Sequence, residues 1–156
     1  MQRLRLPEQV DSVICALDSL NYVTRPADVQ KTFRRVHDAL TPGGLFLFDI
    51  NTPYKLEGLA GQTFLDETED TYCVWRTEFD PKKRLCYYGM DLFQRDGEVW
   101  ERSFEEHIEY AYTAEELTGW LLEAGFTKID VFGDQKCRAP KEDELRVYLA
   151  ARKETT

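Results

Sequence analysis

The stretch that decides the fold runs from residue 11 to residue 50, and it holds two apolar runs separated by an amphipathic segment. The first run is DSVICAL (11–17), and the second is LFLFDI (45–50). Short, nearly continuous apolar runs of this kind are typical of strands buried on both faces, as parallel strands are in α/β proteins. Both runs are therefore predicted to be strands of a parallel sheet.

The segment between the two runs predicts a helix from Pro26 to Leu40. Its apolar side chains recur every three or four residues, at Val29, Phe33, Val36 and Leu40, and so form one stripe that faces a core. Proline suits the first turn of the helix, and the sequence TPGG (41–44) ends it because proline cannot continue a helix and glycine permits a reversal. Strand, helix and strand make a βαβ unit, so the predicted fold class is α/β.

From about residue 63 to residue 112 the apolar period changes to two, which predicts strands. Three such segments are joined by short polar turns and predict a three-stranded antiparallel β meander. They span 72–79, 85–94 and 98–110. Side chains alternate between the two faces of a strand, so Arg102 and His107 cannot both face one cleft unless a bulge intervenes.

The helical pattern resumes after the meander. The sequence TAEE (113–116) fits a capping box at the start of a helix, and Gly125 fits a left-handed stop at its end. Two further strands are predicted at 128–132 and 145–151. We expect a single domain, 1–156, in which 63–112 is an insertion.

Composition and charge exclude several classes of function. The 156 residues include 29 acidic and 20 basic side chains, a formal net charge of −9. Nucleic-acid binding is not expected, because it depends on clustered cationic side chains. No apolar run is long enough to span a membrane. The four cysteines form no CxxC pair and have only two histidines beside them, so no metal site is predicted and a cytoplasmic location is expected.

Polar side chains and an aromatic ring follow each of the two predicted parallel strands. Asp18 and Tyr22 follow the first strand, and Asn51 follows the second. Ligands of open α/β sheets bind beyond the carboxyl ends of the strands, so these side chains are candidates for a binding site. The alternative is that they only form turns and helix caps.

Three stretches of the sequence carry a family resemblance. They are CALDSLNYV (15–23), FRRVHDALTPGGLFLFDINTP (33–53) and YTAEELTGWLLEAGF (112–126). Together they resemble the carboxyl-terminal part of class I S-adenosylmethionine-dependent methyltransferases, in the small-molecule branch with a β insertion after the fifth core strand. The resemblance implies a partial Rossmann-like sheet with terminal antiparallel strands, a methyl-transfer reaction on a small molecule, and a lid made by the meander.

The resemblance also implies roles for individual residues. Leu17 and Asp18 match the turn that approaches the methionine moiety of S-adenosylmethionine, and Tyr22 lies in the same wall. A second group matches the substrate side of the pocket: Asn51, Pro53, Tyr54 and Arg102. His107 matches a position over the pocket, and histidine is the residue type most often used as a general base, so it is the candidate catalytic residue.

The sequence departs from the family at its amino end. No GxGxxG motif is present, and LRLP (4–7) resembles the segment that follows the third core strand. We therefore expect the chain to lack the amino-terminal half of the cofactor site and to expose strand 11–17 as a sheet edge through which it forms a homo-oligomer. The alternative function is a noncatalytic oligomerising or regulatory module derived from this fold. A third is a binder of an aromatic or apolar small molecule in the cleft under the meander.

Overall fold

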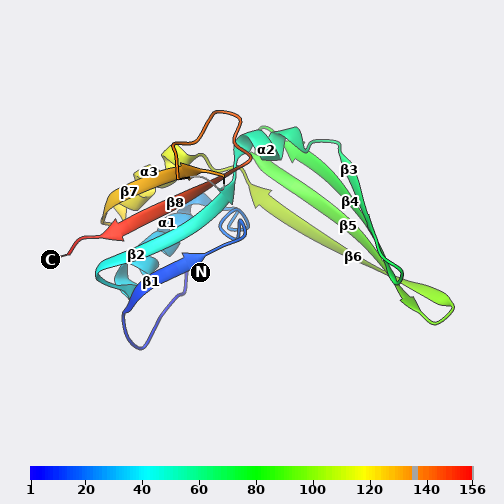
Figure 1. Cartoon of the computed structure of the whole chain (residues 1–156), viewed down its shortest axis with the longest axis horizontal. Coiled ribbons are helices and arrows are strands. Elements are labelled where there is room, and N and C mark those ends of the chain that lie inside the picture. The colour runs from blue at the N-terminus through cyan, green and yellow to red at the C-terminus, as the bar shows by residue number, and fades with distance from the viewer. Residues whose placement is uncertain (135–136, 156) are drawn as a thin grey trace.

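A computed structural model describes residues 1–134 and 137–155, and it confirms the α/β class. Two four-stranded sheets lie side by side (Figure 1). Sheet A has the order β1 (Val10–Cys15), β2 (Leu40–Asn51), β8 (Arg146–Lys153) and β7 (Phe126–Gly133). Sheet B has the order β3 (Thr63–Glu67), β4 (Thr71–Asp80), β5 (Leu85–Asp96) and β6 (Val99–Tyr110). The helices are α1 (Pro26–Ala39), α2 (Pro53–Gly58) and α3 (Ala114–Glu123). No helix in the described part of the chain is long and apolar enough to cross a membrane.

The predicted βαβ unit is present at one edge of sheet A. Strand β1 pairs in parallel with β2, and α1 connects them. Strand β2 begins at Leu40 and not at the predicted Leu45, and its residues 41–44 form a bulge in the ladder with β1. The partner of Val10 is Leu40, whereas the partner of Ser12 is already Leu45. Gly43 accommodates the bulge with a φ of +77°, a conformation that glycine adopts without steric cost.

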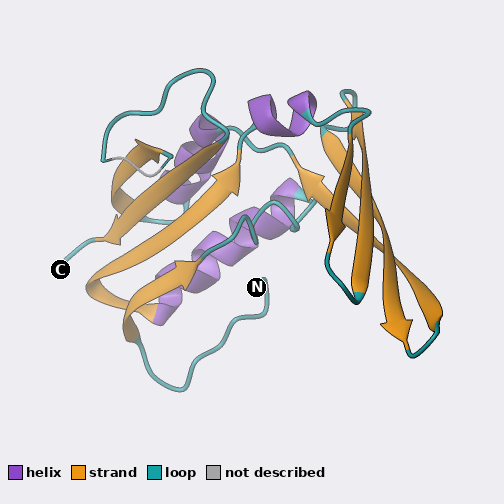
Figure 2. Ribbon diagram, turned by 45° about the vertical axis from the view of Figure 1, so that its right-hand side comes forward, coloured by secondary structure: helices purple, strands orange, loops and turns teal. Residues whose placement is uncertain are grey.

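The main core lies between sheet A and its two long helices, which cover the same face of the sheet (Figure 2). At its centre Phe33 of α1 packs on Phe46 and Phe48 of β2, with ring centroids 6.0 and 5.6 Å away. The prediction that both parallel strands are buried on both faces is wrong for β1 in this chain. Strand β1 is the edge of the sheet, and Ile14 on it is 69% exposed.

Sheet B has four strands, so the prediction of three was one strand short. The additional strand, β3, pairs antiparallel with β4 through residues 63–67. Every residue of β3 is exposed, and a strand without a buried face lacks the alternating apolar pattern by which strands are recognised. A small second core lies where α2 packs on sheet B, around Leu56, Cys86 and Ala111.

Polar contacts join sheet B to the α/β part, and two of them are described first. The first is an ion pair between Arg84 and Glu116 of α3, in which Nη1 and Oε1 are 2.7 Å apart. Glu116 is also the acidic member of the predicted capping box, which the structure confirms through reciprocal bonds with Thr113. The second connection runs through Asn21 and lies at the candidate site.

Candidate functional site

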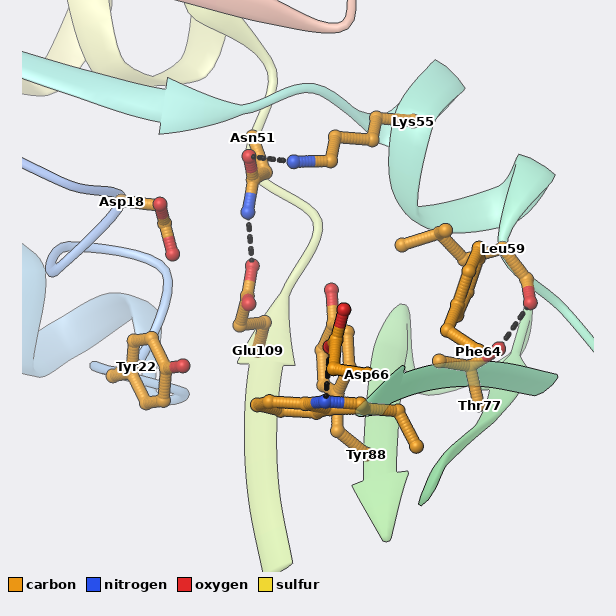
Figure 3. Close-up of a pocket in the computed structure, with 11 residues that line it drawn as sticks. Asp18, Tyr22, Asn51, Lys55, Leu59, Phe64, Asp66, Thr77, Tyr88 and Glu109 are labelled. Carbon is orange, nitrogen blue, oxygen red and sulfur yellow. Dashed lines mark hydrogen bonds between the residues drawn. The ribbon is translucent and has the colours of Figure 1, made fainter. Parts of the chain in front are cut away.

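The loop after β1 has an unusual backbone. Leu17 and Asp18 both have positive φ angles, 58° and 48°, in the region that costs a residue with a Cβ roughly 1–2 kcal/mol. Leu17 is 78% exposed, so apolar burial does not offset this cost. The turn brings Asp18 to the wall of a cavity (Figure 3). Backbone strain of this kind is concentrated at binding and catalytic sites.

An arginine from β8 holds this loop against the end of β2. Arg146 donates from Nη2 to Oδ1 of Asp18 at 2.7 Å and from Nη1 to the carboxylate of Asp49. The backbone N–H of Asp18 also donates to Oδ2 of Asp49, 3.0 Å away. Asp49 is only 4% exposed, and a buried carboxylate needs a positive partner to offset its lost hydration. The loop after β1 is therefore fixed by charge to the neighbouring strands.

Two asparagines join the segments that follow β1 and β2. The backbone N–H of Asn51 donates to Oδ1 of Asn21 at 3.1 Å, and Nδ2 of Asn21 donates to the carbonyl of Asn51 at 3.0 Å. The same Nδ2 donates to the carbonyl of Tyr110 in β6, whose own N–H donates to the carbonyl of Asn21 at 2.8 Å. Asn21 is fully buried. Its amide therefore connects both sheets at the site.

A line of side-chain hydrogen bonds runs from α2 to β6 (Figure 3). Nζ of Lys55 donates to Oδ1 of Asn51 at 2.8 Å. An ammonium group can only donate, so this bond fixes the amide of Asn51 with its NH₂ group toward Glu109. Nδ2 of Asn51 then donates to Oε2 of Glu109, also at 2.8 Å.

These groups line a cavity of about 400 Å³ between the carboxyl ends of β1 and β2 and one face of sheet B. Its size suits a small molecule, and its wall combines apolar and aromatic side chains with a few polar ones, as ligand pockets do. The lining residues are Asp18, Tyr22, Asn51, Lys55, Leu59, Phe64, Asp66, Trp75, Thr77, Tyr88 and Glu109.

Burial shifts the titration of three groups in this wall. Burial raises the pKa of Glu109, against the effect of its hydrogen bond from Asn51. Burial likewise raises the pKa values of Tyr88 and Tyr22, and the carboxylate of Glu109 adds to both shifts. A cavity lined by groups with displaced pKa values is typical of a functional site. Within residues 1–134 and 137–155, no group of three or more His, Cys, Asp or Glu side chains is placed to hold a metal ion.

Three of the residues singled out in the sequence meet at the cavity: Asp18, Tyr22 and Asn51. Leu17 is in the same loop but faces solvent. Pro53 is the first residue of α2, and Tyr54 beside it is exposed. Neither Pro53 nor Tyr54 lines the cavity.

His107 and Arg102 lie on opposite faces of β6. His107 is the cross-strand partner of Tyr88, which places it on the cavity side, and its ring centroid lies 5.9 Å from that of Tyr22 and 6.4 Å from that of Trp75. It does not itself line the cavity, so its catalytic role stays a prediction.

Arg102 lies on the far face of sheet B, away from the cavity. Its Nε donates there to Oδ1 of Asp91 at 2.8 Å, and Asp91 is buried between Arg102 and Arg76. The unbroken register of β5 and β6 keeps this alternation. In this structure Arg102 therefore forms an ion pair on the face opposite to the cavity, and its substrate-binding role stays a prediction.

Two charged residues of the cavity wall, Glu109 and Lys55, were not among the residues singled out in the sequence. Glu109 belongs to the polar face of the third predicted strand, and most of that face is exposed. The structure shows that only its last part is covered: residues 99–106 of β6 are exposed, whereas Glu109 is 3% exposed. Lys55 lies in α2, four residues after Asn51. Because Asn51 ends β2 and is not part of that helix, the helical i, i+4 rule does not mark this pair.

The chain as a whole was compared with known proteins. No family model matches the chain. Over 149 residues the chain is 31% identical to the "Putative methyltransferase YqeM" of Bacillus subtilis (strain 168), which covers 95% of this chain and 60% of that protein. The chain thus spans about three fifths of the length of this relative.

Solved structures similar to this chain also include methyltransferases. An S-adenosylmethionine-dependent methyltransferase from Clostridium acetobutylicum ATCC 824 superposes with a TM-score of 0.89 at 28% identity, over 98% of this chain and 62% of that one. CalS10, an amino pentose methyltransferase from Micromonospora echinaspora, shares the fold, with a TM-score of 0.75 at 16% identity over 97% of this chain and 61% of that one. The chain is therefore related, by sequence and by fold, to the class I S-adenosylmethionine-dependent methyltransferases.

Proposed function

We propose that the chain forms the methyl-acceptor pocket, and the methionine side of the cofactor site, of an S-adenosylmethionine-dependent methyltransferase that acts on a small molecule. The cavity at the carboxyl ends of β1 and β2 carries this proposal. Its volume suits a small molecule, and the related solved structures include one described as an amino pentose methyltransferase. In this proposal sheet B is the lid over the acceptor.

The residues at the end of β1 suit the positively charged end of the cofactor. Asp18 lines the cavity and Tyr22 stands beside it. A sulfonium carries a positive charge, which a carboxylate and an aromatic face both attract. S-adenosylmethionine supplies the methyl group when bound, and the chain's own residues exclude water and orient the acceptor toward it. The sequence shows no glycine-rich loop for the remainder of the cofactor.

A proton must leave the acceptor when methylation occurs at a protonated nitrogen or at a hydroxyl group. His107 is the candidate group for this proton in the present proposal, because an imidazole titrates near neutral pH. Its ring contacts both Tyr22 and Trp75 of the cavity wall.

Titration calorimetry with S-adenosylmethionine tests the proposed function. We expect the chain to bind it, and Asp18→Asn to weaken binding by about tenfold or more, which corresponds to the loss of one charged contact. Asp38→Asn is the matched control, because Asp38 is exposed on α1 and should leave binding unchanged. No heat at millimolar ligand would favour the noncatalytic alternative. Equal binding by the Asp18→Asn variant would overturn the role of Asp18 in holding the cofactor.

We also propose that the chain associates with a second copy through β1. Strand β1 pairs on one side only, and Ile14 and Leu17 on or beside it are exposed. An open edge with apolar side chains favours strand addition, and a lysine on such an edge prevents it. Sedimentation equilibrium should show a concentration-dependent dimer that Ile14→Lys abolishes and Leu122→Lys, on exposed α3, preserves. A wild-type chain that stays monomeric at every concentration contradicts this proposal.

A further inference from the structure

The charges in the cavity wall are unbalanced. Three carboxylates line the cavity, from Asp18, Asp66 and Glu109, against one cationic side chain, Lys55. The ammonium of Lys55 is already bonded to Asn51. The cavity therefore presents more negative than positive charge to a bound molecule, and it disfavours an acceptor that is itself an anion.

The three carboxylates differ in what already neutralises them. Asp18 is paired with Arg146 at 2.7 Å, and Asp66 accepts a hydrogen bond from the indole N–H of Trp75 at 3.2 Å. Glu109 accepts from the neutral amide of Asn51. Glu109 is only 3% exposed. Among the residues that the structure describes, no lysine, arginine or histidine nevertheless lies within ion-pair distance of its carboxylate.

The surroundings of Glu109 also suit a cation. The rings of Tyr22 and Tyr88 line the same cavity (Figure 3), and the ring of Trp75 lines it too. Aromatic faces attract ammonium groups, more strongly where water is excluded. The amide of Asn51, fixed by Lys55, holds the carboxylate in place. Glu109 is thus an oriented carboxylate inside an aromatic cavity.

We infer that the acceptor is an amine that enters as its ammonium form, and that Glu109 is the residue that selects it. The ammonium nitrogen passes one proton to His107, the group proposed above for this proton, and its lone pair then accepts the methyl group. This inference rests on the proposed function. A bound ammonium supplies the positive charge that Glu109 lacks and meets the aromatic rings with its remaining surface. A hydroxyl acceptor offers no such charge, and a carboxylate or a thiolate meets repulsion from all three acids.

Binding of a small probe pair tests this inference without knowledge of the natural acceptor. Benzylammonium and benzyl alcohol have the same shape and differ in charge. In titrations followed by the indole N–H signal of Trp75 in ¹H–¹⁵N NMR spectra, we expect benzylammonium to bind at least about tenfold more tightly than benzyl alcohol. Equal binding of the two probes, or preference for the alcohol, overturns the inference.

Variants of Glu109 then show whether this residue makes the selection. We expect Glu109→Gln to abolish the preference for benzylammonium, and Glu109→Asp, which keeps the charge, to retain part of it. Glu101→Gln is the matched control, since Glu101 lies on the same face of β6 but is exposed. Thermal unfolding of each variant verifies that it is folded. An unchanged preference in folded Glu109→Gln overturns the role of Glu109.

The outcome is separable from that of the cofactor titration. If the probes bind charge-selectively through Glu109 but S-adenosylmethionine does not bind, the cavity is an amine-binding site and the proposed methyl transfer is overturned. If S-adenosylmethionine binds but the probes show no charge selectivity, the proposed function stands and the inference of an amine acceptor is overturned.

Discussion

Arg146→Met should destabilise the folded chain by about 3–5 kcal/mol, the usual cost of removing one partner from a buried ion pair. The guanidinium is the one group that neutralises Asp49 and Asp18 together in the described part of the chain. Asp49 is 4% exposed, so it cannot regain hydration when Arg146 is lost. Urea unfolding measures the difference, and we expect the midpoint to fall without a change in slope.

A double variant separates the charge effect from the loss of packing. In Arg146→Met with Asp49→Asn, no ionised carboxylate remains buried at position 49, so a large part of the lost stability should return. If the double variant is as unstable as the sum of the two single variants, the coupling inferred from the hydrogen bonds at this site is absent.

Asn21→Ala should also cost about 3–5 kcal/mol, because it leaves several buried polar groups without partners, each at roughly 1–3 kcal/mol. These groups are the backbone N–H and carbonyl of Asn51 and the carbonyl of Tyr110. The same substitution removes the side-chain bonds that link the end of β6 and the end of β2 to this loop. We therefore expect benzylammonium binding to fall together with stability, by thermal unfolding and by the Trp75 signal.

A nearby hydroxyl provides the control for Asn21. Ser19 lies two residues earlier in the same loop, and its Oγ donates to the carbonyl of Ala16 at an exposed position. Water replaces this bond when it is removed, so Ser19→Ala should change stability by less than about 0.5 kcal/mol. A similar loss in the two variants would mean that burial of Asn21 is not the cause.

The strands and helices of the α/β part were predictable because each is marked by a pattern of neighbouring residues. The apolar run at 11–17 overlaps β1, which ends at Cys15, the run at 45–50 lies in β2, and the capping box at Thr113 begins α3. Burial on one face, a fixed period and a hydrogen-bonding cap each leave a signature within a few neighbouring residues. Strand β3 leaves none, because its side chains are exposed on both faces.

The candidate site was predictable only in part, since its contacts join distant segments. Asp18 and Asn51 were identified because both follow parallel strands. Arg146, however, meets Asp18 across 128 positions, and no local pattern marks this pairing. Glu109 shares its strand face with exposed residues, so only the packing of the two sheets reveals that it is buried.

The positive φ angles of Leu17 and Asp18 have a consequence for raising the stability of this protein. A glycine at position 17 would relieve the backbone of Leu17, whose side chain contributes little burial, yet it would also loosen the turn that presents Asp18. Stability and ligand recognition therefore make opposite demands on one short segment. Selection for heat resistance alone would be expected to alter this loop early and to weaken recognition as it does so.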